Sequence, residues 1–265
     1  MQGKEIKMLL LQPQFLPLLI LVFVFGLTIG SFLNVLIYRI PANISIARGR
    51  SFCPTCKHRI QNRDLIPVLS YILLGGRCRH CNQKISIRYP LVELSTGLLA
   101  LLIVLIKGIF LEALIIFAIG AILISISLID WDTMTIPDSL IVALIPLVII
   151  LIWLSGDWNI WNRVIGAFLV SLPMYLSLYL VKDSFGGGDI KLFFVLGFLL
   201  GWEKTLLTLF ISSIVAAVIG VVAARSKNEN IRGKHIPFGP YICTAAMISL
   251  LLGDQILSWY LGLYM

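Results

Sequence analysis

The chain has 265 residues, of which 59% are apolar and 13% are charged, and its mean hydropathy is +0.98. Soluble domains carry about 25% charged residues, so the composition excludes an ordinary soluble protein and predicts a membrane protein. The net charge of +8 is concentrated between positions 39 and 88, where ten Lys and Arg residues occur with one acidic residue, Asp64. It does not indicate nucleic-acid binding, because no stacking aromatic residues alternate with the basic ones.

The first apolar run covers residues 15–37. It is long enough to cross a bilayer, which takes about 20 residues. It is also too long for the apolar part of a signal peptide, and no small-residue cleavage site follows it. We therefore expect no cleavable signal peptide and a first transmembrane helix that stays attached.

The basic segment that follows, residues 39–90, is typical of the cytoplasmic side of a membrane protein. Such a segment also attracts anionic lipid headgroups. Its apolar piece, residues 65–74, is too short to span, so we expect it either to pack inside the loop domain or to lie on the membrane surface.

Seven further apolar runs follow the loop, which gives eight candidate spans and predicts an all-α polytopic membrane protein. They cover residues 91–106, 109–129, 139–154, 163–181, 190–201, 205–224 and 238–253. The run 190–201 is short, so it is expected to be tilted, extended by its flanks, or re-entrant.

The order of the spans predicts the orientation of the links between them. If the basic loop is cytoplasmic, the links 130–138, 182–189 and 225–237 are cytoplasmic too, and the last of these carries four basic residues. Asp130 and Asp189 are then expected on the same, cytoplasmic face.

Four cysteines form two C-x-x-C pairs in the loop: Cys53, Cys56, Cys78 and Cys81. Each such pair fits a tight turn, and two pairs at this separation complete a tetrahedral set of thiolates. The pattern predicts a structural zinc ion with a closed coordination shell. We interpret His58 and His80 as solvated loop residues, and Cys243 as a small core residue of its span.

Acidic residues at the membrane edge are the candidates for chemistry, because a charge there is costly and is kept for a function. Asp189 follows Gly186, Gly187 and Gly188 directly, and Lys191 comes two residues later. The partner acid has three candidates in one short link: Asp130, Asp132 and Asp138. We interpret Asp138 as the N-terminal cap of the next helix and Asp132 as a solvated acid. Asp130 lies nearest the membrane, but these arguments leave the choice open.

Several segments resemble the bacterial type IV prepilin peptidases, which belong to the membrane-embedded G-x-G-D aspartic proteases. The segments Gly186-Gly-Gly188-Asp189-Ile-Lys191 and Asp130-Trp-Asp-Thr-Met-Thr-Ile-Pro137-Asp138 are similar to the family's two aspartate motifs. Further matches, in family order, are Gly30-Ser-Phe-Leu-Asn-Val35 with Arg39-Ile-Pro41, Arg50-Ser-Phe-Cys53-Pro, Arg77-Cys-Arg-His-Cys81, Arg88-Tyr-Pro-Leu-Val-Glu93 and Pro237-Phe-Gly-Pro240.

The resemblance implies that Asp130 and Asp189 are the catalytic pair, with Gly186, Gly187, Gly188 and Lys191 in the active-site loop. It implies removal of a short basic leader from type IV prepilins or pseudopilins at the cytoplasmic face of the bacterial inner membrane. It also implies N-methylation of the new terminus with S-adenosylmethionine, an activity associated with the loop domain. The expected domains are residues 1–38 (first helix), 39–90 (zinc-binding loop) and 91–265 (peptidase).

Two other functions stay open on the residues alone. A proton or cation transporter would use paired intramembrane acids, and a non-catalytic scaffold would use the zinc domain to dock a partner. For the peptidase, we expect Asp189 to act as the base and Asp130 as the acid, because a helix N-terminus and Lys191 both favour a charged Asp189.

Overall fold

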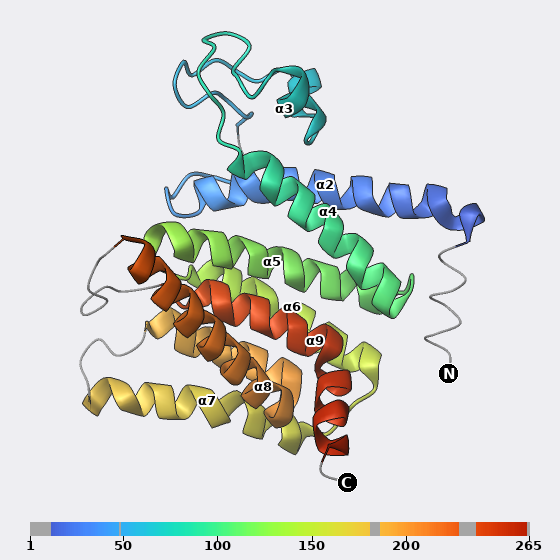
Figure 1. Cartoon of the computed structure of the whole chain (residues 1–265), viewed down its shortest axis with the longest axis vertical. Helices are drawn as coiled ribbons and strands as arrows, with labels where there is room; N and C mark the ends of the chain where they lie inside the picture. Colours follow the sequence, from blue (N-terminus) through green and yellow to red (C-terminus); the bar gives the residue numbers. More distant parts are fainter. Residues whose placement is uncertain (1–11, 48, 181–185, 228–236, 264–265) are drawn as a thin grey trace. The chain divides into compact units, whose positions relative to one another are not determined.

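The structure is a computed structural model that describes residues 12–47, 49–180, 186–227 and 237–263 (Figure 1). The helices are η1 (Pro13–Phe15), α2 (Leu16–Arg39), η2 (Asn62–Leu65), α3 (Leu69–Leu73), α4 (Arg88–Lys107), α5 (Leu111–Thr133), α6 (Asp138–Ser155), α7 (Ile160–Leu180), α8 (Gly187–Lys227) and α9 (Gly239–Gly262). Most of the predicted link 225–237, with Arg232 and Lys234, lies outside the described residues, as do residues 182–185 of the link before Asp189.

The predicted all-helical membrane fold is confirmed. Within the described residues, six helices are long and apolar enough to cross a membrane, and they cover Pro13–Arg39, Arg88–Lys107, Leu111–Thr133, Asp138–Ser155, Gly187–Val222 and Gly239–Gly262. The predicted span 163–181 is helical as α7 but is not among these six. The predicted spans 190–201 and 205–224 lie in α8, which is interrupted by a kink at Gly201.

The chain divides into two compact units, Met1–Ala121 and Ile122–Met265, with the boundary inside α5. This boundary is defined by packing, whereas the predicted domains 1–38, 39–90 and 91–265 were drawn by function and stay a prediction. Each unit has its own helix packing, and the two are described separately.

In the first unit, α2 packs against α4 (Figure 1). A Cβ atom at Gly26 would lie 2.7 Å from the Cα atom of Gly97, and one at Gly30 would lie 2.7 Å from the Cα atom of Glu93. The glycines therefore permit a close approach of the two backbones, as small residues do between membrane helices. This packing places the side chain of Glu93 beside the C-terminal half of α2.

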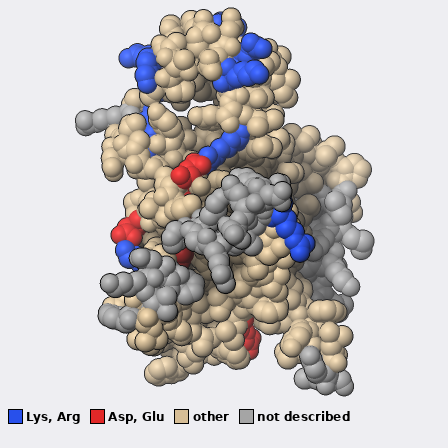
Figure 2. Space-filling model, turned by 60° about the vertical axis from the view of Figure 1, so that its left-hand side comes forward, with Lys and Arg blue, Asp and Glu red and all other residues tan. Residues whose placement is uncertain are grey.

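The loop between α2 and α4 carries eight of the 21 Lys and Arg residues, and Figure 2 shows Lys and Arg side chains gathered on this part of the chain. The apolar piece at residues 65–74 forms η2 and α3, and both Ile72 and Leu73 are strongly exposed, Leu73 to 83%. The opposite side of this piece packs inside the loop domain, where the hydroxyl group of Tyr71 donates to the carbonyl oxygen of Ile85 at 3.4 Å. Contact of the exposed side with a membrane surface stays a prediction.

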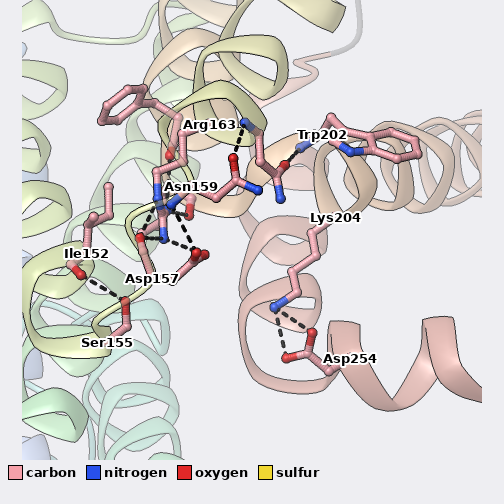
Figure 3. A network of polar contacts seen from close by, with 11 residues as sticks. Ile152, Ser155, Asp157, Asn159, Arg163, Trp202, Lys204 and Asp254 are labelled. Atoms are coloured by element: carbon pink, nitrogen blue, oxygen red, sulfur yellow. Dashed lines mark hydrogen bonds and ion pairs between the residues drawn. The ribbon is translucent and has the colours of Figure 1, made fainter.

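In the second unit, α8 packs against α7, α9 and α6. Its kink is fixed by polar groups from the start of α7. The buried guanidinium group of Arg163 donates to the carbonyl oxygen of Leu199 at 2.8 Å, and it also pairs with Asp157 at 2.9 Å (Figure 3). The side-chain oxygen of Asn162 accepts the backbone N–H of Trp202 at 2.9 Å. The kink at Gly201 interrupts the hydrogen bonds within the helix. The carbonyl oxygen of Leu199 before the kink and the N–H of Trp202 after it are therefore bonded by side chains of α7.

The kink explains the short predicted span 190–201. From Gly187 to the kink, α8 rises by about 21 Å, which is less than the roughly 30 Å of a hydrocarbon core. The helix begins three residues before the predicted run. Extension by its N-terminal flank, one of the three predicted arrangements, is therefore observed.

We expect Gly166→Ala to destabilise the second unit. A Cβ atom at Gly166 would lie 2.5 Å from the carbonyl oxygen of Gly197 and 2.6 Å from the carbonyl carbon of Gly201, so α7 and α8 would have to separate. Overpacking of this kind costs about 1–3 kcal/mol. The measurement is thermal unfolding in detergent, with Gly262→Ala as the control because nothing lies within 4 Å of the Cβ position there. An unfolding temperature equal to that of the control would contradict the packing described.

Candidate active site and metal site

Asp130 lies in the last turn of α5 and is buried, with 5% of its surface exposed. Its Oδ2 atom accepts the backbone N–H of Gly239, the first residue of α9, at 2.9 Å. A Cβ atom at Gly239 would lie 2.7 Å from the same oxygen. The glycine therefore lets the start of α9 approach the carboxyl group closely.

Sequence reasoning gave no role to Gly239. The signal that could have found it is the Pro237-Phe-Gly-Pro240 segment, in which a glycine and a proline open an apolar run after a polar link. A helix N-terminus presents free N–H groups, and these are natural partners for a carboxylate.

Asp189 lies in the first turn of α8, as predicted. Its backbone N–H donates to the carbonyl oxygen of Gly186 at 3.1 Å, and its carboxyl group accepts the backbone N–H of Gly186. This reciprocal pattern is that of an acid at the third helical position that caps its own helix. The side chain is neither fully buried nor fully exposed, so it is held in place and still accessible.

The two aspartates belong to the same unit, and their carboxyl groups lie within electrostatic range of each other. Cys243 of α9 is buried, as predicted, and lies within electrostatic range of both. Gly188 packs on Ile136, since a Cβ atom there would lie 2.8 Å from the Cβ atom of Ile136. The glycine run therefore brings the start of α8 against the segment that follows Asp130.

The other two acids of the Asp130 link have different surroundings. Asp132 is exposed, as predicted. Asp138 is not the N-cap of α6: Pro137 holds that position, and Asp138 is the first helical residue, with its carboxyl group 2.8 Å from Nζ of Lys191. The N-cap interpretation was wrong because Lys191, 53 residues away in sequence, provides the partner. Lys191 was expected to favour a charged Asp189. Because its ammonium group pairs with Asp138 instead, Lys191 is a weak argument for a charged Asp189.

The four predicted thiols converge in the first unit. The Sγ atoms of Cys53, Cys56, Cys78 and Cys81 all lie within 4.8 Å of one another, and those of Cys53 and Cys81 are 3.9 Å apart. In a tetrahedral site with metal–sulfur bonds of about 2.3 Å, the sulfur atoms lie about 3.8 Å apart. The cluster therefore fits one metal ion with four thiolate ligands.

Two hairpin turns of the same design hold the thiols. In the first, the backbone N–H of Cys53 donates to the carbonyl oxygen of His58, and the carbonyl oxygen of Cys53 accepts the backbone N–H of Lys57 at 2.9 Å. In the second, Cys78 makes the same bonds with Gln83 and Asn82. The residue after each second cysteine, Lys57 or Asn82, has a positive φ, 58° and 56° respectively.

The environment of the thiols favours thiolates at part of the cluster. The backbone N–H of Cys56 donates to Cys53 and lowers the pKa of that thiol to about 6. For Cys81, the N–H of Gln83 acts in the same sense, but burial and the three neighbouring thiols together raise the pKa to about 11. A bound cation would displace the remaining protons. His58 and His80 are exposed, as predicted, and their ring centroids lie 3.5 Å apart with the ring planes inclined by 34°.

Fold and site together define a multi-pass membrane protein with two aspartates at helix ends and a cluster of four thiols that could hold a metal ion. The chain belongs to the type IV leader peptidase family. The model of that family matches residues 116–221, and the model of the bacterial peptidase A24 N-terminal domain matches residues 24–107. The first match contains Asp130 and Asp189, and the second contains the four cysteines.

Curated relatives match over nearly the whole chain. A prepilin leader peptidase/N-methyltransferase of Aeromonas salmonicida is 36% identical over 272 residues, which cover 91% of this chain and 93% of the relative. Proteins of the same name from Pseudomonas aeruginosa and Legionella pneumophila are 35% and 34% identical, over 89% and 91% of this chain and 91% and 93% of their own lengths. No solved structure gives a significant match.

Proposed function

We propose that this chain is a membrane-embedded aspartic endopeptidase that removes the leader from type IV prepilins or pseudopilins and then methylates the new N-terminus. The observation that carries the peptidase activity is the pair formed by Asp130 and Asp189, two carboxyl groups within electrostatic range in one unit. The relatives' shared name, prepilin leader peptidase/N-methyltransferase, supports the substrate and the second activity.

Hydrolysis of a peptide bond by such a pair needs one ionised and one protonated carboxyl group. The ionised group takes a proton from water, whose oxygen attacks the scissile carbonyl carbon. The protonated group donates a hydrogen bond to the carbonyl oxygen and stabilises the charge that develops there. The C–N bond then breaks as the leaving amine gains a proton. The Gly239 N–H fixes the orientation of Asp130, and the Gly186 N–H fixes that of Asp189.

The glycine run has a separate role in this proposal. Gly187 has nothing within 4 Å of its Cβ position, so an extended substrate backbone can approach the first turn of α8. Lys191 lies at the same helix end, where its pairing with Asp138 joins the starts of α6 and α8. We therefore assign Lys191 to holding the active-site loop in place.

The metal ion is proposed to be a structural zinc, because zinc prefers four thiolates in tetrahedral geometry. When bound, it would join the two hairpins of the loop and leave no open position for a substrate. S-adenosylmethionine, when bound, would supply the methyl group for the new N-terminus. The proposed location is the bacterial inner membrane, with the loop and both aspartates on the cytoplasmic face. Anionic lipid is the proposed partner of the basic loop, and no nucleic-acid partner is proposed.

The test uses the full chain and a prepilin reconstituted together in lipid vesicles. We expect mass spectrometry to show a pilin that has lost its leader and, with S-adenosylmethionine added, has gained the mass of one CH₂ group at its N-terminus. A vesicle that retains only precursor, under conditions in which a relative processes the same precursor, would overturn the peptidase proposal. Cleavage without the added mass would contradict the proposed methyltransferase activity and leave the proposed peptidase activity supported.

A further inference from the structure

The second unit contains a groove of about 520 Å³ among α6, α7 and α8. Both α6 and α7 pack against α8, and all three helices supply side chains to the wall (Figure 1). Its lining includes Asp138, Val142, Phe168, Tyr175, Lys191 and Phe194. Ligand sites in proteins measure about 300–1,000 Å³, so the groove is large enough to hold a ligand.

The groove faces away from Asp189. The residues of α8 that line it are Ile190, Lys191, Phe194 and Val195. An α-helix turns by about 100° per residue, so these four residues lie about 100° to 240° around α8 from Asp189. The groove is therefore on the other side of the helix from the catalytic carboxyl group, and the proposed peptide hydrolysis does not use it.

One end of the groove carries a pair of opposite charges. Nζ of Lys191 lies 2.8 Å and 2.9 Å from the two carboxyl oxygens of Asp138, and both side chains are more than half exposed. They are the charged residues among the described residues of the wall. An ammonium group has three donors and a carboxylate accepts about four hydrogen bonds. Each group can therefore bind a further partner without leaving the pair.

The other end of the groove is apolar. The rings of Phe168 in α7 and Phe194 in α8 meet edge to face, with their centroids 5.3 Å apart. Gly166 of α7 lies against Gly197 of α8, so residues later in α7 lie beside residues earlier in α8. This antiparallel packing places Tyr175 toward the charged end and the two phenylalanines at the apolar end.

The direction of the groove matches that of a membrane lipid. Asp138 is the first residue of α6 and Lys191 is the fifth residue of α8, and both helices are long and apolar enough to cross a membrane. The ends of such helices lie at the depth of the lipid headgroups. From Tyr175 to Phe168, α7 rises by about 10 Å toward the membrane interior. The groove therefore runs from headgroup depth into the depth of the acyl chains.

We propose that this groove binds a phospholipid with a zwitterionic phosphoethanolamine headgroup. The lipid phosphate accepts hydrogen bonds from the Lys191 ammonium group, and the lipid ammonium group donates to the Asp138 carboxylate. The first part of one acyl chain lies against Phe168 and Phe194. The proposal goes beyond the proposed enzyme and does not depend on it.

The charge of the pair selects this headgroup over two others. A glycerol headgroup leaves the lipid anionic, so its phosphate gains Lys191 but meets Asp138 without a compensating cation. A choline headgroup is zwitterionic, but its quaternary ammonium group has no N–H to donate to the carboxylate. The ethanolamine headgroup alone among the three satisfies both members of the pair.

The test is photo-cross-linking of the full chain in nanodiscs of a choline lipid. Three trace lipids carry the same photoreactive acyl chain and an ethanolamine, glycerol or choline headgroup, and mass spectrometry measures their yield on groove peptides of α6, α7 and α8. Counting only these peptides separates the groove from lipid bound at the basic loop. We expect the ethanolamine lipid to label the groove at least about threefold more than either other lipid, the usual size of an exposed charge interaction.

Substitutions of the pair test the charge argument. Asp138→Asn leaves the ammonium group of Lys191 alone, so we expect the anionic glycerol lipid to become the strongest label and the ethanolamine lipid to fall at least about threefold. Lys191→Gln leaves the carboxylate alone, which repels every lipid phosphate. We expect it to reduce labelling by the ethanolamine and glycerol lipids alike.

A third variant fills the groove and leaves the pair intact. Val142 lines the groove and is 61% exposed, so Val142→Trp adds volume there without overpacking the core. We expect it to lower groove labelling by all three lipids at least about threefold. Ile149→Trp is the matched control, because Ile149 lies in the same helix, is 56% exposed and is outside the lining. Unfolding temperatures check that each variant is folded.

Each of three results would overturn the proposal. Equal labelling of the wild-type groove by the three lipids would show a contact without headgroup selection. Strongest wild-type labelling by the anionic lipid would show that Lys191 acts without Asp138. Labelling of Val142→Trp as strong as that of Ile149→Trp would show that the lipid lies outside the groove. None of these results bears on prepilin cleavage or methylation, so a failure here is distinct from a failure of the proposed function.

Discussion

Asp130→Asn and Asp189→Asn are each expected to reduce prepilin cleavage by at least about 10²- to 10⁴-fold, the usual contribution of a general acid or base. The amide cannot take a proton from water, and it cannot donate a carboxylic proton. Asn at position 130 can still accept the Gly239 N–H, which is 2.9 Å from Oδ2 in the wild type. The loss of activity should therefore come without loss of fold.

The measurement is the initial rate of leader removal in vesicles, followed by mass spectrometry. Asp132→Asn is the matched control, because Asp132 lies two residues from Asp130 and is exposed. Asp138→Asn is a second control that breaks the pair with Lys191, and its effect should be at least tenfold smaller than that of either catalytic variant. Wild-type cleavage by both Asp130→Asn and Asp189→Asn would refute the catalytic pair and favour a transporter.

Removal of the metal is the second large expected effect. Structural zinc contributes about 10–16 kcal/mol of apparent binding free energy in small zinc domains. The loop between α2 and α4 has little regular structure: outside η2 and α3, its described residues form two isolated β-bridges. We expect purified wild-type protein to contain about one zinc per chain, and Cys56→Ser or Cys78→Ser to reduce that content to background.

Limited proteolysis measures whether the loop between α2 and α4 unfolds when the metal is lost. Chelation or either serine variant should expose cleavage sites at the basic residues of the loop, whereas the membrane helices stay intact. Cys243→Ala is the control, because Cys243 is buried in α9 and is not part of the cluster, so it should keep its zinc. Wild-type protein that lacks zinc, with a loop equally resistant before and after chelation, would rule out the structural zinc.

Local patterns in the sequence were sufficient to predict the all-helical membrane fold and the cysteine cluster, although six helices of the described residues, rather than the eight predicted spans, are long and apolar enough to cross a membrane. Apolar runs of about 20 residues must be helical in a bilayer, because no water is present to satisfy the backbone. Two C-x-x-C pairs need only short turns to converge, and the structure places their sulfur atoms within 4.8 Å. Asp189 could also be placed at a helix start, because three glycines directly precede it and an apolar run follows.

Contacts between residues far apart in sequence could not be predicted in this way. Asp138 was expected to cap α6, but Lys191 pairs with it from α8. Gly239 lies 109 residues from the aspartate it binds, and the bond from Val68 to Glu93 depends on the approach of α2 to α4 and on a strained turn. The kink at Gly201 likewise depends on Asn162 and Arg163 of another helix.

The sequence by itself thus determined the class of fold, the residue types of both sites and their family, because hydropathy, ligand spacing and short motifs act over a few neighbouring residues. Only the tertiary structure decided which groups hold Asp130, what pairs with Lys191, and that Glu93 lies buried beside α2. The positions of Asp130 and Glu93 follow from close approaches of the Asp130 carboxyl group to Gly239 and of the Glu93 backbone to Gly30. Each such contact depends on two segments that are far apart in the sequence, so the local sequence of one segment does not predict it.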